Sequence, residues 1–129
     1  MTGNELLDSA LALLMTNRKY APEYLEFALP LVNMLLAEIH GSNNALRASR
    51  GLAEYESPQS IIALDDALPC EDELCVPALA HGLVAKLIMD DGDMAKTAYY
   101  QNQYVNGVLD AAQYVCAPID DFYAKGAAE

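Results

Sequence analysis

The chain has 129 residues, the length of a single domain, and carries 19 acidic against 7 basic residues for a formal net charge of −12. This balance argues against a DNA-reading role, because affinity for a phosphate backbone comes mainly from Lys and Arg. The longest apolar stretch, positions 74–89, is interrupted by His81 and Lys86. A membrane span needs about 20 apolar residues, so we expect none.

The first predicted helix lies near the N-terminus. Thr2 and Glu5 have the spacing of a capping box, in which side chains satisfy the free amides of a first helical turn. Apolar residues then recur on one face as far as Leu14, and the helix is predicted to end near Thr16. The chain has no leader pattern and no disulfide-framework spacing of cysteines, so we expect a protein made in the cytosol.

The second helix is predicted to begin at Pro22, because proline is favoured at a first helical position. Gly41 is expected to end it by adopting a left-handed backbone. Pro30 removes one backbone hydrogen bond inside the helix and predicts a kink near positions 26–30. The apolar positions that follow the helical pattern are Leu25, Ala28, Leu29, Val32, Leu35, Leu36 and Ile39.

Helical periodicity fades between positions 42 and 69. Positions 43–50 allow a short helical turn, whereas Ile61, Ile62 and Leu64 look like an extended piece. Such a long stretch without strong structure is unusual in a compact domain and often binds a partner. We therefore predict a protruding loop or arm.

The third predicted helix is apolar on more than one side. One stripe contains Val76, Leu79, Ala80, Leu83, Val84, Leu87 and Ile88, and a second contains Ala78, Ala85 and Met89. A helix of this kind has to be covered on several faces, which predicts a central position. Gly82 is expected to let a neighbour approach closely, and the sequence Asp90, Asp91, Gly92 to end the helix.

The fourth helix is predicted to follow Asp93 as N-cap. Its expected core face contains Met94, Ala98, Val105, Val108, Leu109 and Ala112, and an adjacent face carries Tyr100, Tyr104, Ala111 and Tyr114. Together these patterns predict an all-α fold, a small bundle of about four main helices over positions 1–117 with an arm at 42–69. Positions 118–129 are predicted to be a loose tail.

No candidate catalytic, cofactor or metal site has a strong pattern. Asp90, Asp91 and Asp93 flank a helix break and are interpreted as capping residues. Glu23 and Glu26 have ExxE spacing, and Asp90 and Asp93 repeat it. All-α nucleotide pyrophosphatases bind magnesium through paired acidic motifs of this kind, but unpaired acidic residues on a protein surface are the more common interpretation. A zinc site is not favoured, since the spacing of Cys70, Cys75, Cys116, His40 and His81 lacks tight ligand pairs. We expect no enzyme, no cofactor and no metal.

The remaining features are candidates for a protein interface. Tyrosine is enriched at oligomer interfaces, and arginine pairs well with an acidic neighbour. Packing at the core margin and simple solvation are the alternatives for these residues. The candidate interface residues are Tyr100, Tyr104, Tyr114, Arg47, Arg50, Ile61 and Ile62.

Two segments carry a resemblance to a known family. "FALPLVNMLLAEI" followed by "LDDALPCEDELCVPALAHGLVAKLIMDDGDMAKTAYYQNQY" resembles small helical virion proteins of long-tailed phages and prophages of Firmicutes, the head-to-tail adaptors or connectors. In those proteins an acidic "DD-LPL" segment precedes a helix reading roughly "ALxxGLAAxLxxDxxD". His81 stands where an aromatic residue such as Tyr is expected, and Cys70 where Leu is expected.

The resemblance implies a non-enzymatic structural protein of the virion neck, assembled in the cytoplasm of the host bacterium. It would form a homo-oligomeric ring that docks on the portal protein and contacts tail or stopper proteins. DNA would pass through the ring without specific binding, which suits the acidic balance. The alternatives are a tail-completion or tail-terminator protein, the magnesium-dependent nucleotide pyrophosphatase, and a small regulatory adaptor without a virion role.

Overall fold

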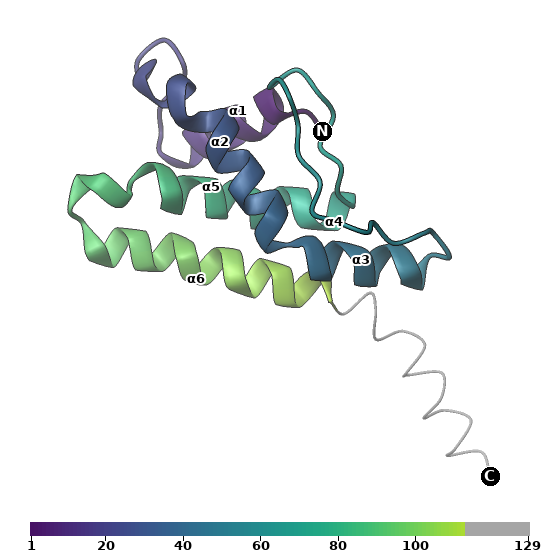
Figure 1. The fold of residues 1–129 in the computed structure, drawn as a ribbon. Coiled ribbons are helices and arrows are strands. Elements are labelled where there is room, and N and C mark those ends of the chain that lie inside the picture. The colour runs from purple at the N-terminus through teal and green to yellow at the C-terminus, as the bar shows by residue number, and fades with distance from the viewer. Residues whose placement is uncertain (113–129) are drawn as a thin grey trace.

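The computed structural model describes residues 1–112, and all of the regular elements within this range are helical (Figure 1). The all-α prediction is confirmed. The elements are α1 (Gly3–Leu13), α2 (Glu23–Glu38), α3 (His40–Ser49), α4 (Asp72–Leu74), the turn η1 (Cys75–Leu79), α5 (Ala80–Leu87), the short turn η2 (Met89–Asp91) and α6 (Met94–Ala111). Tyr114, Cys116 and the predicted tail at 118–129 lie outside the described residues.

Helix α5 lies at the centre of the fold, as its apolar pattern predicts. It packs against α1, α2 and α6, which surround it on different sides (Figure 1). Only His81 and Lys86 on this helix are half-buried, and every other residue is buried. Burial of this kind stabilises each large aliphatic side chain by about 1.5–3 kcal/mol. The helix therefore forms the core onto which the other elements are placed.

Close contacts between helices are made possible by glycine. A Cβ atom at Gly82 of α5 would lie 2.8 Å from Leu35 of α2 and 2.8 Å from Tyr104 of α6. A Cβ atom at Gly107 of α6 would lie 2.9 Å from the Cβ atom of Ala78 in η1. The predicted close approach at Gly82 is confirmed, and α2 and α6 both use it.

Two helices begin as the sequence predicts. The Thr2 hydroxyl accepts a hydrogen bond from the amide of Glu5 at 3.2 Å, and the Asp93 carboxylate accepts one from the amide of Lys96 at 3.0 Å. Gly92 precedes Asp93 with φ 78°, a left-handed backbone that glycine adopts without strain. These local signals confirm both predicted caps and the break before α6.

The predicted stop at Gly41 is wrong. Helix α2 ends at Glu38, and α3 begins at His40 after the single residue Ile39, which has φ −90° and ψ 6°. Gly41 therefore lies in the first turn of α3. The chain re-enters a helix at once because Ile39 and Leu46 are both buried and hold the junction and α3 against the core.

The predicted third helix is interrupted at its start. Val76 has φ −134° and ψ 130°, which are extended values, because the ring of Pro77 disfavours a helical backbone at the residue before it. Val76 is consequently half-exposed, and Met89 at the other end is exposed, although both were expected in apolar stripes. The continuous buried stripe begins at Ala78.

The segment after α3 lies against the helices, so the prediction of a protruding arm at 42–69 is wrong. Positions 42–49 belong to α3, and the rest returns along α3 and reaches the start of α1 before it leads to α4 (Figure 1). The Asn33 amide donates to the Ile61 carbonyl at 3.0 Å and accepts from the Ile61 amide at 2.8 Å. Asn44 makes the same paired contact with Tyr55, at 2.9 and 2.8 Å.

A third asparagine and the N-terminus hold the rest of this segment. The buried Asn43 donates to the Pro69 carbonyl at 3.3 Å and accepts from the Glu71 amide at 2.9 Å. Thr2 and Ala67 form an isolated antiparallel bridge. Several backbone groups of the segment are thus paired with helix side chains or with the start of α1, and such pairing lets a segment without its own secondary structure pack.

Candidate functional site

Helix α6 turns a different face to the core from the one its sequence predicts. Tyr104 and Ala111 are buried, with Tyr100, Gly107 and Val108 half-buried beside them. The expected core face therefore points outward except at Val108, and that prediction is wrong. Tyrosines can be buried here because both hydroxyl groups find partners: Tyr104 donates to a Glu38 carboxylate at 3.0 Å, and Tyr100 donates to the Leu13 carbonyl at 3.2 Å.

The outward face of α6 carries an exposed apolar strip. We define the α6 outer strip as Met94, Ala98, Val105, Leu109 and Ala112, all of which are exposed. Met94 is 84% exposed and Leu109 is 62% exposed. Met94, Ala98, Val105 and Ala112 alternate steps of four and three residues when Gln101 and Val108 are included, the spacing with which one helix packs along another, and Leu109 lies beside this row. The strip is thus patterned like a buried helix face but is solvent-exposed within residues 1–112.

Two hollows extend this apolar surface toward neighbouring helices. One, of about 290 Å³, lies between α6 and the end of α2 and is lined by Ile39, Tyr104, Val105 and Leu109 among others. The second, of about 310 Å³, lies between α6 and α3. Val108 lines both of them. The exposed strip and the two hollows form one continuous candidate interaction surface along α6.

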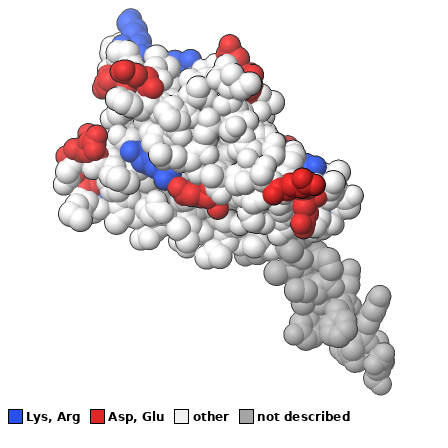
Figure 2. All heavy atoms as spheres, viewed as in Figure 1, with Lys and Arg blue, Asp and Glu red and all other residues white. Residues whose placement is uncertain are grey.

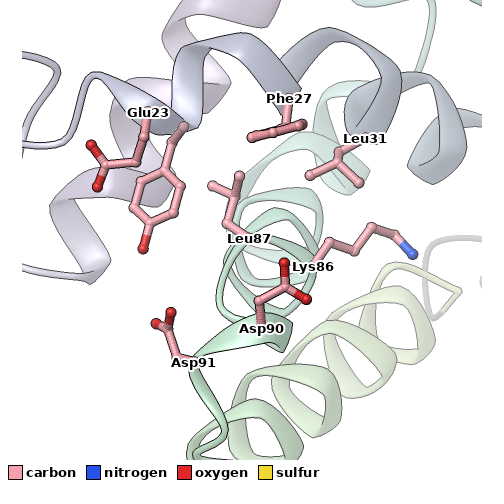
Figure 3. A pocket seen from close by; sticks show the side chains of 8 residues that line it. Glu23, Phe27, Leu31, Lys86, Leu87, Asp90 and Asp91 are labelled. Atoms are coloured by element: carbon pink, nitrogen blue, oxygen red, sulfur yellow. The ribbon is translucent and has the colours of Figure 1, made fainter.

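A separate pocket of about 320 Å³ lies between α2 and the α5–η2 junction (Figure 3). Its apolar part is made by Tyr24, Phe27, Leu31 and Leu87, and its edge carries the carboxylates of Glu23, Asp90 and Asp91. Phe27 is 55% exposed, as is Met34 two turns further along α2. We define the α2 outer patch as Phe27, Leu31 and Met34. Sequence analysis missed it, although these residues also alternate steps of four and three.

The pocket is acidic at its edge. Lys86 also lines it, but its amino group pairs with a Glu38 carboxylate at 2.6 Å and points away from Asp90 and Asp91 (Figure 3). Burial raises the pKa of the Tyr24 phenol, and the charges of Asp91 and Glu23 raise it further. An apolar floor with an acidic edge suits a long cationic side chain whose stem packs and whose charge is neutralised.

The acidic residues of the pyrophosphatase alternative are partly brought together. Glu23 and Asp90 line the same pocket, but Asp93 caps α6 and Glu26 does not line the pocket. Among the described residues, no group of three His, Cys, Asp or Glu side chains is placed to hold a metal ion.

The predicted interface residues fall into different environments. Tyr104 and Ile61 are each only 5% exposed, so neither presents a side chain on the surface. Tyr100 is half-buried and stacks on His81 with ring centroids 6.0 Å apart. Ile62 is 90% exposed. Tyr100 and Tyr104 therefore belong mainly to the margin of the core. Of these four residues, only Ile62 exposes most of its side chain to a partner.

The two candidate arginines have partners within the chain. Arg50 pairs with Glu71 at 3.2 Å and also with Glu73, whose carboxyl pKa is lowered mainly by this hydrogen bond. The Arg47 guanidinium lies 4.3 Å from the ring centroid of Tyr55. Arg47 therefore attaches the segment after α3 to the body of the fold, and Arg50 attaches the acidic turn before α5.

Comparison with known proteins finds no matching family model, no matching characterised protein and no matching solved structure. None of the helices in the described part of the chain is both long and apolar enough to cross a bilayer.

Proposed function

We propose that this protein is a non-enzymatic structural subunit, a head-to-tail adaptor that forms a ring in the neck of a long-tailed phage particle. The observation that carries the proposal is the α6 outer strip. Isolated exposed hydrophobic residues are normal, but a helix-long row with packing periodicity indicates a surface that a protein partner covers. The resemblance of the two sequence segments to adaptors names the kind of partner.

A ring of identical subunits needs two different surfaces on each copy, because each subunit contacts its neighbours head to tail. The α6 outer strip and the α2 outer patch are two apolar surfaces on different helices. Charged groups on one face of the molecule stand in small clusters separated by wide uncharged areas (Figure 2). We assign the α6 outer strip to the neighbouring subunit in the ring and the acid-edged α2 pocket to a basic side chain of the portal protein.

The net charge of −12 supports a position around a DNA channel. A phosphate backbone is repelled by such a surface, so DNA slides through without being retained. Binding to the portal would place the protein in the virion neck after assembly in the host cytoplasm.

The test is native mass spectrometry of the purified chain, alone and mixed with the portal ring encoded in the same genome. The expected result is binding in a number that matches the portal's symmetry. Leu109→Glu should abolish the ring, because a carboxylate would be buried without a partner. Asn106→Glu adds the same charge on the polar side of α6, where Asn106 is exposed, and should leave assembly intact.

Circular dichroism of both variants checks that the fold is kept. An unchanged portal spectrum with the wild-type chain would overturn the adaptor assignment, whereas binding to the tail tube instead would favour the tail-completion or tail-terminator alternative. One observation favours the pyrophosphatase alternative, the presence of Glu23 and Asp90 in one pocket. Magnesium-dependent release of pyrophosphate from nucleoside triphosphates would establish it in place of the adaptor.

A further inference from the structure

Two cysteines meet in a part of the fold that the proposed function does not use. The Sγ atoms of Cys70 and Cys75 are 3.2 Å apart, on either side of the short helix α4. Both are free thiols, Cys70 half-buried and Cys75 buried at 4% exposure. Packing as small apolar groups explains why each is covered, but it does not require the two sulfur atoms to contact each other.

The backbone around both thiols is held in place. Asn43 binds the Pro69 carbonyl and the Glu71 amide, which flank Cys70 in the chain. The Cys70 amide donates to the Leu68 carbonyl at 2.9 Å. Cys75 opens the turn η1 and belongs to the hydrophobic core. The contact between the sulfurs is therefore built by the fold and is not a chance approach of a free loop.

The two thiols are not equivalent. The hydrogen bond between them favours a thiolate on one sulfur and keeps the other protonated, and in this way it lowers the pKa of Cys75 and raises the pKa of Cys70. In the neutral pair, the Cys75 thiol donates to the Glu71 carbonyl at 3.7 Å. A thiolate beside a thiol is the arrangement in which one sulfur reacts and the second resolves the product.

We propose that Cys70 and Cys75 form an oxidation site that reduces a small hydroperoxide and closes an intramolecular disulfide. The Cys75 thiolate attacks one oxygen of hydrogen peroxide, the O–O bond breaks, and the leaving hydroxide takes up the proton that Cys75 released when it ionised, which gives water. Cys75 is then a sulfenic acid. The Cys70 sulfur attacks the Cys75 sulfur, the S–O bond breaks, and the second hydroxide leaves with the Cys70 proton as water.

The balance of these steps is two thiols and one peroxide giving one disulfide and two waters. The thiols lose two electrons in total, and the peroxide gains them. A small oxidant is required because Cys75 is almost fully covered. The sulfur atoms have to approach by only about 1 Å, since a covalent S–S bond is about 2.05 Å long.

The experiment uses the full chain carrying Cys116→Ser, which removes the third cysteine of the sequence and leaves the pair intact. Treatment with one equivalent of hydrogen peroxide should lower the intact mass by about 2 Da and remove both titratable thiols without forming dimers, and dithiothreitol should reverse it. Peptide mapping should place the link between Cys70 and Cys75. An unchanged mass, or disulfides formed between chains, would overturn the proposal.

Two further variants separate the roles of the sulfurs. With Cys70→Ser added, Cys75 should accumulate a sulfenic acid that dimedone traps, because no resolving thiol remains. With Cys75→Ala added, Cys70 should be oxidised more slowly than Cys75 is in the Cys70→Ser variant, because burial still raises the pKa of Cys70, whereas the introduced serine hydroxyl can donate a hydrogen bond to a Cys75 thiolate. Equal rates in both variants would overturn the assignment of Cys75 as the reactive sulfur, provided that circular dichroism shows both to be folded.

Discussion

Replacing Gly82 with alanine would place a methyl group where two buried side chains already meet. The new Cβ atom would lie 2.8 Å from the Leu35 Cδ2 atom and 2.8 Å from the Tyr104 Cδ1 atom, distances that real Cβ atoms essentially never show. Leu35 is fully buried and Tyr104 is tied to Glu38 through its hydroxyl group, so neither side chain has free space into which it can move.

Two effects of opposite sign set the magnitude. Alanine is favoured over glycine inside a helix by about 1 kcal/mol. Forcing an extra methyl group into a packed core costs about 1–3 kcal/mol. Because the new methyl group would meet two side chains at once, we expect the cost at Gly82 to lie toward the upper end of this range. We expect Gly82→Ala to lower the free energy of unfolding by about 1–2 kcal/mol and Tm by roughly 4–8 °C.

The assay is urea unfolding followed by circular dichroism, with Gly41→Ala as the matched control. Gly41 also lies inside a helix, but a Cβ atom there would meet no neighbouring atom within 4 Å. Gly41→Ala should therefore show only the gain from the higher helix propensity of alanine, up to about 1 kcal/mol of added stability. The packing argument is refuted if Gly82→Ala is as stable as the wild type, or if both variants shift stability in the same direction.

Three further outcomes are expected. Asn43→Ala should cost about 1–3 kcal/mol in urea unfolding, because it removes a buried amide and leaves two part-buried backbone groups unpaired, whereas Asn102→Ala at an exposed position should cost nothing. Burial raises the pKa of Tyr104, so above about pH 10 the unfolded chain loses a proton that the folded chain keeps, and stability should fall by up to about 1.4 kcal/mol per pH unit. Tyr104→Phe should remove this part of the alkaline slope, and an unchanged slope would contradict the assignment. Glu23→Ala combined with Glu26→Ala should leave helicity unchanged and weaken portal binding, because Glu23 is one of the carboxylates that we assign to a basic side chain of the portal. Loss of magnesium binding in calorimetry would point to the enzyme instead.

The features that could be predicted from sequence are those decided within a few residues. The caps at Thr2 and Asp93 each depend on a side chain and an amide three positions away, so both could be predicted from the sequence. The central place of α5 was readable because a helix that is apolar on all sides has only one stable environment. The break at Val76 was also readable in principle, since Pro77 disfavours a helical residue before it.

The orientation of α6 could not be read from its pattern. The helix has two apolar faces, and periodicity alone favoured the one with more aliphatic residues. Which face is buried depends on partners far away in the chain: Glu38 and the Leu13 carbonyl accept from the tyrosine hydroxyls, and Gly82 admits the ring of Tyr104. The same residue that was read as a core position, Leu109, thereby becomes part of the candidate interface.

The segment between α3 and α4 was misread for a related reason. Asparagine contacts with a distant backbone follow no period, so Asn33, Asn43 and Asn44 look like ordinary polar helix residues in the sequence. Their effect is to replace a missing strand partner, because an amide side chain offers a donor and an acceptor side by side as a backbone does. A low-periodicity segment can therefore be ordered by the elements around it.

These asparagines also make the packing of this segment sensitive to deamidation. Deamidation turns the side-chain NH₂ group into an oxygen, which keeps the acceptor and deletes the donor. At Asn33 the resulting carboxylate would face the Ile61 carbonyl that the amide now binds at 3.0 Å, so attraction would become repulsion. Asn43 and Asn44 would change in the same way toward Pro69 and Tyr55. Hydrolysis of three small side chains, with no cut in the backbone, would thus weaken the attachment of the connection between α3 and α4 to the helices.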